Sequence, residues 1–151
     1  MSAHKITIDT KGQTLQLLHD QEVVHQFPIS TSRFGLGHAS GSFQTPVGRF
    51  RIYQKIGGDE PLNTVFRGRV PVTGPADWDK QSDLITSRIL WLDGLEPHNE
   101  NTRERFIYIH GTNEEHLIGK PASHGCVRMR NEDVVRLFDL VEAGTEVEIL
   151  G

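Results

Sequence analysis

The sequence predicts a mainly β fold, a sandwich or partly closed barrel with one α-helix late in the chain. Apolar and polar residues alternate along residues 5–28 with turn residues between them, as is typical of a β-meander. Two later runs, 88–92 and 105–110, are rich in branched and aromatic residues and predict largely buried strands. A convincing helical period appears only after Met129.

The N-terminal part of the chain is expected to form three strands, over Lys5–Asp9, Thr14–Leu18 and Glu22–Pro28. Residues 31–48 are rich in glycine and serine, but they are too few and too mixed in composition to link two domains. We therefore expect an ordered loop that leads into a strand at Arg49–Gln54. Residues 56–86 show no lasting period, so no element is predicted there.

The strand at 105–110 would place His110 at the end of a core strand. In the helix that follows Met129, Asn131 is the predicted N-cap, and Glu132 and Asp133 put negative charge at the positive end of the helix dipole. The predicted apolar stripe consists of Val134, Leu137, Phe138 and Val141. Gly144 is expected to end the helix before a last strand at residues 145–150.

Length and composition predict a single domain over residues 1–151, because 151 residues suit one core. The net charge is −4, so no nucleic acid and no anionic membrane is expected as a partner. No apolar run approaches the roughly 20 residues of a membrane span. Without a leader in the sequence as given, we expect a cytoplasmic protein, or a periplasmic or cell-envelope one if a leader was removed.

Residues 110–128 carry the predicted chemistry, because they hold three histidines, three glycines and the only cysteine. Cys126 would act as a nucleophile once an imidazole accepts its proton. His110 is preferred as that base over His124, since a strand would fix His110 and a returning loop can reach it. Gly125 permits a sharp turn, and the amides there are natural oxyanion donors. No Asp or Glu stands at an obvious spacing to orient the imidazole, and a backbone carbonyl is one candidate for that role.

These motifs resemble the L,D-transpeptidase (YkuD-type) catalytic domain family. The resemblance rests on Ile-His-Gly-Thr-Asn at 109–113 and Ser-His-Gly-Cys-Val-Arg at 123–128. It extends to Thr-Pro-Val-Gly-Arg-Phe at 45–50 and to the helix-to-strand turn at 141–147. The similarity covers roughly residues 4–150 and implies a YkuD-like β fold.

The resemblance implies that Cys126 attacks the L,D peptide bond of a peptidoglycan tetrapeptide stem, after diaminopimelate or lysine at position three. D-alanine would leave, and a thioester acyl-enzyme would remain. By the same resemblance His110 is the base, the Gly111 carbonyl orients its ring, and the amides of Gly125 and Cys126 bind the oxyanion. The remaining motif positions are Ser123, His124, which would shape the pocket, and Arg128, which would hold the catalytic loop or a substrate carboxylate.

Water as acceptor would make the protein an L,D-carboxypeptidase that trims muropeptides during recycling in the cytoplasm, and this is the favoured prediction. The alternative is an L,D-transpeptidase that forms 3-3 crosslinks or exchanges D-amino acids in the cell wall. A third alternative is a non-enzymatic module that binds stem peptides, which the presence of a nucleophile disfavours. Acylation by a carbapenem is expected from the family.

The same residues also allow other interpretations. Cysteine is often a buried apolar residue, and a structural role for His124 is about as plausible as a functional one. A zinc site would need His110, His116, His124 and Cys126, but their spacing matches no common zinc pattern, and we expect neither metal nor organic cofactor. Trp78 and Trp91 are expected either in the core or in the lining of a pocket, and the core is preferred. Three arginines are expected on the solvated surface unless they border the cleft: Arg33, Arg67 and Arg88.

Overall fold

A computed structural model describes residues 4–72 and 83–151 of the chain. The strands are β1 (His4–Asp9), β2 (Thr14–His19), β3 (Glu22–Ser30), β4 (Gly48–Ile56), β5 (Val65–Arg67), β6 (Val70–Val72), β7 (Ile85–Gly94), β8 (Tyr108–Gly111), β9 (Val127–Met129) and β10 (Glu146–Leu150). The described helices are α1 (Asn131–Leu140) and two short 3₁₀ helices, Pro97–Asn99 and Glu115–Leu117. The mainly β fold with one late α-helix is thus confirmed.

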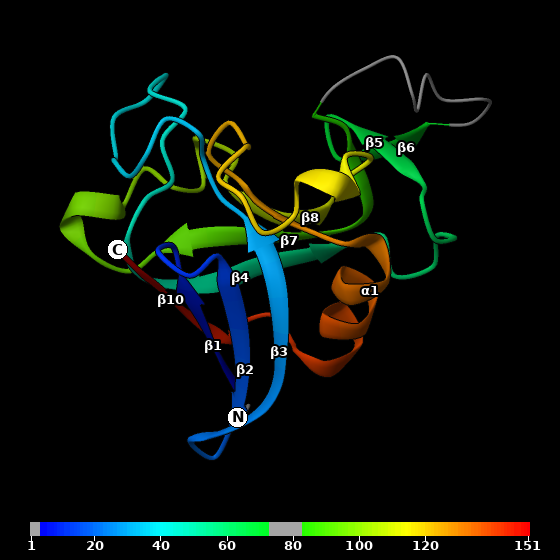
Figure 1. Cartoon of the computed structure of the whole chain (residues 1–151), viewed down its shortest axis with the longest axis horizontal. Helices are drawn as coiled ribbons and strands as arrows, with labels where there is room; N and C mark the ends of the chain where they lie inside the picture. The colour runs from blue at the N-terminus through cyan, green and yellow to red at the C-terminus, as the bar shows by residue number, and fades with distance from the viewer. Residues whose placement is uncertain (1–3, 73–82) are drawn as a thin grey trace.

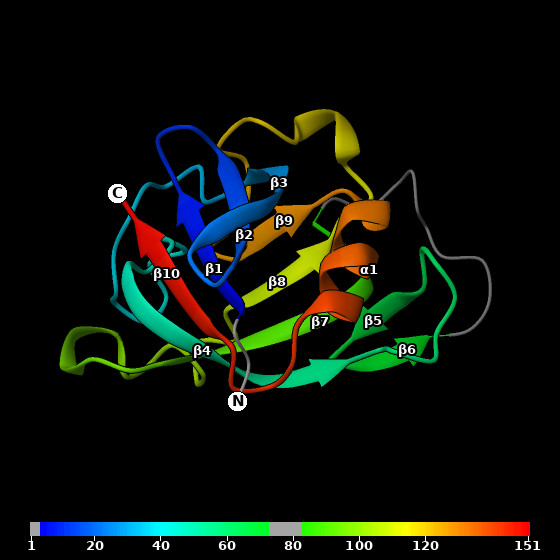
Figure 2. The same ribbon diagram turned by 90° about the horizontal axis from the view of Figure 1, so that it is seen from below.

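The strands form one sheet that closes on itself. Their order is β4-β10-β1-β2-β3-β9-β8-β7-β5-β6, and β4 also pairs with β7. This pairing closes a barrel from which the β5–β6 hairpin extends (Figures 1 and 2). The neighbours β1 and β10 are parallel, as are β8 and β9, whereas the other pairs are antiparallel. Each parallel neighbour is reached by a long connection, as parallel pairing requires.

Apolar side chains gather in two places. The larger cluster fills the barrel and includes the inward side chains of β1 to β4 and β7 to β10. The apolar face of α1 joins this cluster and packs beside β7 and β8 (Figure 2). A smaller cluster of Phe66, Ile89 and Tyr108 lies on the outer face of β7 and β8, under the β5–β6 hairpin. Cys126 packs against the smaller cluster.

The start of the helix differs from the prediction. Arg130, not Asn131, is the N-cap residue, and it makes no side-chain capping bond. Asn131 is the first helical residue, and its side chain is buried: Nδ2 donates to the Thr112 carbonyl at 2.8 Å, and Oδ1 accepts from Ser87 Oγ at 2.6 Å. Asn131 therefore fixes α1 to β7 and to the end of β8. The helix also ends earlier than predicted, at Leu140.

The prediction of a solvated Arg88 was wrong, and Trp91 packs against the smaller core cluster and not in the barrel. Arg88 is 7% exposed, and its Nη1 donates to the carbonyls of Glu60 and Ser87 at 2.9 and 2.6 Å. Trp91 lies outside the barrel core, half-buried against the smaller cluster on the outer face. The prediction for Trp78 concerns a residue outside the described ranges. Over residues 4–72 and 83–151, no helix has the length and apolar character to cross a membrane.

Candidate active site

The pairing of β8 with β9 places His110 and Cys126 on one surface. Cys126 immediately precedes β9, and the parallel register sets Ile109 opposite Val127 and His110 opposite Arg128. Ile109 and Val127 are fully buried in the barrel core. Because side chains alternate along a strand, His110 and Cys126 project from the opposite, outer face. Two candidate catalytic groups thus share one region of the barrel wall although a long loop separates them in sequence.

The sulfur of Cys126 contacts two backbone groups of the neighbouring segment. Sγ accepts the N–H of Tyr108 at 3.3 Å and lies 3.4 Å from the carbonyl oxygen of Phe106, to which the thiol donates. Burial raises the pKa of the Cys126 thiol to about 12, although the Tyr108 N–H partly offsets this by favouring the thiolate. The resting nucleophile is therefore a neutral thiol, which must lose its proton during attack.

The ring of His110 is oriented by its own strand. His110 is 1% exposed, and Nδ1 lies 2.5 Å from the carbonyl oxygen of Gly111. A carbonyl only accepts, so Nδ1 carries the proton and Nε2 keeps a lone pair. Burial lowers the pKa of His110, which keeps the ring neutral. Within the described part of the chain, no hydrogen bond joins this ring to Cys126 Sγ, so the backbone alone sets its tautomer.

Gly111 is required by close packing behind His110. A Cβ at this position would lie 2.5 Å from Asn131 Oδ1 and 2.6 Å from the carbonyl oxygen of Thr86. Such distances are far inside normal van der Waals contact, so a side chain here would displace the backbone. The first residue of α1 and strand β7 therefore hold the carbonyl that orients the His110 ring.

Ser123 closes the turn that presents Cys126. Its Oγ donates to the Cys126 carbonyl at 2.6 Å and accepts from the Gly125 N–H at 3.3 Å. Gly125 has a φ of +120°, a conformation that favours glycine, and its carbonyl accepts from Thr45 Oγ1 at 3.0 Å. The predicted ordered loop 31–48 thus supports the cysteine turn. One of the two predicted oxyanion donors, the Gly125 N–H, already has a partner within the turn.

Asp83 joins two of the predicted motif residues, and sequence reasoning missed it. Its Oδ1 accepts from Arg128 Nη2 at 2.6 Å and from Nε at 3.2 Å, and its Oδ2 lies 2.9 Å from His124 Nδ1. Arg33 Nη2 lies 3.0 Å from His124 Nε2. Because arginine can only donate, Nε2 is the acceptor and the ring proton is on Nδ1, which is in close contact with Asp83 Oδ2 but lacks hydrogen-bond geometry. His124 is therefore a link between two charged groups.

Arg128 is the buried member of this network. It is 1% exposed and also pairs with Glu114 Oε1 at 3.3 Å. Arg128 thus bridges Asp83 and Glu114 beside the cysteine turn, while its Nη1 is buried without a hydrogen-bond partner among the described residues. Asp83 lies 45 residues from Arg128 in sequence and carried no local signal that could have identified it. Glu114 lies inside the predicted segment 110–128, but its residue type alone did not set it apart.

Two hollows lie beside His124 and Arg33. One, of about 200 Å³, is lined by Ser40, Gly41, Phe43, Glu104, Arg105, Ile107 and His124. The other, of about 440 Å³, is lined by Arg33, Glu114, Leu117, Pro121 and Ala122. Loops 31–48 and 111–125 both contribute to these walls.

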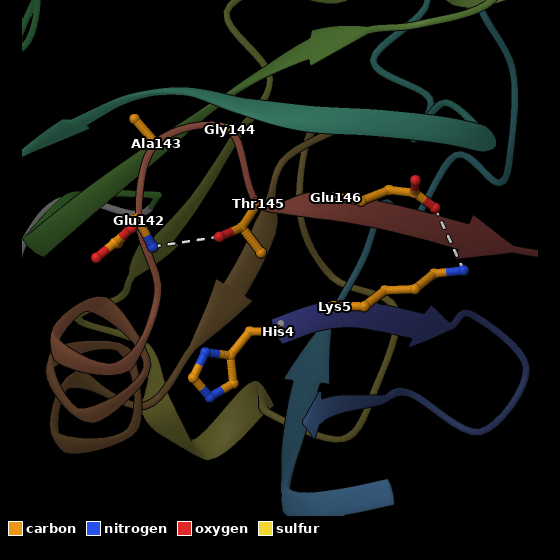
Figure 3. Close-up of a pocket in the computed structure, with 7 residues that line it drawn as sticks. All are labelled: His4, Lys5, Glu142, Ala143, Gly144, Thr145 and Glu146. Atoms are coloured by element: carbon orange, nitrogen blue, oxygen red, sulfur yellow. Dashed lines mark hydrogen bonds and ion pairs between the residues drawn. The ribbon is translucent and has the colours of Figure 1, made fainter. Parts of the chain in front are cut away.

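A third hollow, of about 480 Å³, lies at the other end of the barrel (Figure 3). It is lined by His4, Lys5 and residues 142–146. These residues mark the start of β1 and β10, whereas Cys126 lies near the end of β3, which runs parallel to β1. This hollow is therefore separate from the cysteine and histidine.

The zinc alternative finds no support in the arrangement of its four residues. Among the described residues, no group of three or more His, Cys, Asp or Glu side chains is placed to hold a metal ion. His110 Nδ1 is bound to Gly111, and His124 uses its two nitrogens for Arg33 and Asp83. These nitrogens are engaged with protein groups that hold each ring in place.

The arrangement suits a cysteine enzyme of acyl transfer, because a thiol and a neutral imidazole of fixed tautomer project from the same face of two paired strands. The chain belongs to the L,D-transpeptidase catalytic domain family, YkuD, whose model matches residues 3–149. This confirms the resemblance that the motifs at 109–113 and 123–128 suggested.

Relatives with related sequences agree with this assignment. The chain is 54% identical to YkuD of Bacillus subtilis over 146 residues, which cover 97% of this chain and 65% of that protein. A second B. subtilis relative, YqjB, is 48% identical over 50 residues, or 33% of this chain and 28% of that protein. The chain thus spans less than two thirds of these relatives.

Solved structures share the fold at low sequence identity. An L,D-transpeptidase from Mycobacterium smegmatis superposes with a TM-score of 0.67 at 17% identity, over 99% of this chain and 59% of that one. L,D-transpeptidase 3 from Mycobacterium tuberculosis, in complex with a faropenem-derived adduct, has a TM-score of 0.65 at 18% identity, over 99% of this chain and 60% of that one. The barrel is therefore a fold that L,D-transpeptidases share.

Proposed function

We propose that the protein cleaves the L,D peptide bond of peptidoglycan tetrapeptide stems through a thioester on Cys126. The observation that carries this proposal is the position of the Cys126 thiol on the same surface as the His110 ring, whose tautomer the Gly111 carbonyl fixes. In the proposed reaction, Nε2 of His110 accepts the thiol proton as Sγ bonds to the carbonyl carbon. The same nitrogen then returns the proton to the amine of the departing D-alanine.

The negative charge of the tetrahedral intermediate would be stabilised by backbone N–H groups at the cysteine turn. We assign this role first to the amide of Cys126, because the Gly125 N–H donates to Ser123 Oγ. The amide of Gly125 would join it if that 3.3 Å bond, which is long, gives way in the reaction.

We further propose that water completes the reaction, which makes the protein an L,D-carboxypeptidase that trims muropeptides, and that it acts in the cytoplasm. The cytoplasmic location is a prediction from sequence. It is tested by fractionating cells that produce the full-length gene product from its own start codon. Detection of that protein only in the cell envelope would reject the cytoplasmic role.

Transpeptidation is the second candidate. It is favoured by one observation: separate hollows of about 200 and 440 Å³ adjoin the linked residues His124 and Arg33. Two hollows could receive an acyl donor and an amine acceptor. A 3-3 crosslink would then form when the side-chain amine of a second stem attacks the thioester.

The experiment is incubation of the pure protein with a disaccharide-tetrapeptide, with and without a D-amino acid or a second stem, followed by mass spectrometry. Cys126→Ala is the matched control. Tripeptide and free D-alanine as the only products would support the carboxypeptidase, whereas crosslinked or exchanged products would support the transpeptidase. Turnover by Cys126→Ala would reject the assignment of Cys126 as the nucleophile. Binding without turnover by the wild type would favour the alternative of a non-enzymatic module that binds stem peptides.

A further inference from the structure

Arg69 holds an unusual position at the tip of the β5–β6 hairpin. Gly68 and Arg69 have φ values of +55° and +65°, as in the tight two-residue turns that join antiparallel strands. The hairpin carries the Arg69 guanidinium over two aromatic rings, 4.6 Å from the centroid of Trp91 and 5.1 Å from that of Phe106. Nη1 donates to the hydroxyl of Tyr108 at 2.9 Å. The guanidinium is thus oriented by three side chains.

Arg69 lies beside the nucleophile. Phe106 and Tyr108, which contact the guanidinium, are also the two residues whose backbone groups contact Cys126 Sγ. Burial raises the pKa of Tyr108, so its hydroxyl stays protonated. That hydroxyl accepts from Arg69 and keeps its own proton to donate to a ligand.

No carboxylate of residues 4–72 or 83–151 balances the charge of Arg69. Arg103 is a useful contrast, because it stacks on Tyr53 at 4.8 Å and has its own partner, Glu104, at 3.6 Å. Arg69 therefore presents free N–H donors in a fork that matches a carboxylate, next to apolar rings that reduce its hydration.

The strand register indicates which part of a substrate would meet Arg69. Trp91 pairs with Tyr108, whereas Ile89 pairs with His110. Arg69 thus lies at the Tyr108 end of β8, away from His110, where the proposed reaction places the departing amine. A group at Arg69 would belong to the acyl part that stays on Cys126.

We propose that Arg69 and the Tyr108 hydroxyl bind the side-chain carboxylate of the third stem residue, and so select diaminopimelate over lysine. Both side chains end in an ammonium group, but only diaminopimelate adds a carboxylate there. Lysine would bring a second cation toward Arg69 without a compensating anion. This inference rests on the proposed function and specifies its substrate.

The test compares three tetrapeptides that differ at position three: meso-diaminopimelate, its side-chain carboxamide, and lysine. For the wild type, kcat/KM for D-alanine release should be about 10-fold or more higher with the free carboxylate, as expected for a charge-assisted bidentate contact. Arg69→Gln should remove most of this preference by lowering kcat/KM for the diaminopimelate stem only. Arg69→Lys should restore part of it, since a charge without a planar fork remains.

Arg103→Gln is the matched control, because it removes a second arginine stacked on the same aromatic surface, and it should leave the preference intact. Calorimetry of each tetrapeptide with Cys126→Ala measures recognition separately from turnover. Adding Arg69→Gln to this variant should weaken the binding of the diaminopimelate stem only. Equal losses on all three stems in Arg69→Gln would overturn the inference, as would a preference that follows the terminal D-alanine carboxylate. No turnover of any stem by the wild type would instead reject the proposed function.

Discussion

The ion pair between Asp83 and Arg128 should contribute strongly to both the stability of the protein and the shape of the cysteine loop. Arg128 is 1% exposed, and two of its nitrogens contact Asp83 Oδ1, at 2.6 and 3.2 Å. Asp83→Ala would leave a buried guanidinium with Glu114 as its remaining carboxylate, at 3.3 Å.

The size of the effect follows from burial. Breaking a fully buried pair costs about 3–5 kcal/mol, but the Asp83 side chain is 34% exposed and Glu114 remains. We therefore expect Asp83→Ala to lower the free energy of unfolding by about 2–3 kcal/mol, or the Tm by about 4–12 °C in a chain of this length. Arg128→Met should remove the buried charge, so adding Asp83→Ala to it should cost much less.

The assay is a double-mutant cycle in urea, with the wild type, both single variants and the double variant. A coupling energy of about 1–3 kcal/mol is expected for groups in direct contact. Stability losses of the two variants that add to within about 0.5 kcal/mol would refute the reasoning, because the pair would then be energetically independent despite its geometry.

Three further predictions concern the reacting groups. Because burial raises the pKa of the Cys126 thiol to about 12, its rate of alkylation by iodoacetamide should keep rising with pH beyond 10, and a plateau between pH 7 and 8 would show a preformed thiolate instead. Gly111→Ala should cost about 1–3 kcal/mol of stability, measured in urea, and should reduce the rate of D-alanine release more strongly than any loss of folded protein explains; full activity would contradict a role for this carbonyl. A carbapenem should add its mass to the intact protein and not to Cys126→Ala, and an unmodified wild type would argue against an accessible thiol.

Much of the fold was predictable from sequence because the strands that line the barrel alternate locally. The predicted strand at 5–9 is within one residue of β1, and the run at 88–92 lies inside β7. The β5–β6 hairpin and the short strand β9 were missed. Each of these three strands has three residues, which is too short for a period to be recognised.

The errors have a common cause in tertiary contacts. Asn131 has the residue type of a helix cap, but its amide bonds to groups on β7 and at the end of β8. Arg88 has the residue type of a surface position, yet it bonds to the carbonyls of Glu60 and Ser87. A local propensity could not anticipate either case, because the partners become neighbours only in the folded chain.

The candidate site also contains some residues that local sequence patterns identify and others that become neighbours only in the folded chain. Cys126 and His110 were found because they belong to two local motifs. Asp83 was not found, since it is 45 residues from Arg128 in sequence and follows a region without a periodic pattern. The sequence therefore identified the groups expected to react and missed a carboxylate that links two motif residues beside them.

The parallel pairing of β8 and β9 bears on how such enzymes can change their substrates. His110 and Cys126 are positioned by adjacent strands of the barrel wall, and residues 116–121 of the connection between them are half-buried or exposed. Insertions or exchanges in that connection should alter the 440 Å³ hollow, to which it contributes Glu114, Leu117, Pro121 and Ala122, without separating thiol from imidazole. We therefore expect a library confined to 116–121 to change the shape of this hollow while the strands that carry thiol and imidazole stay in place.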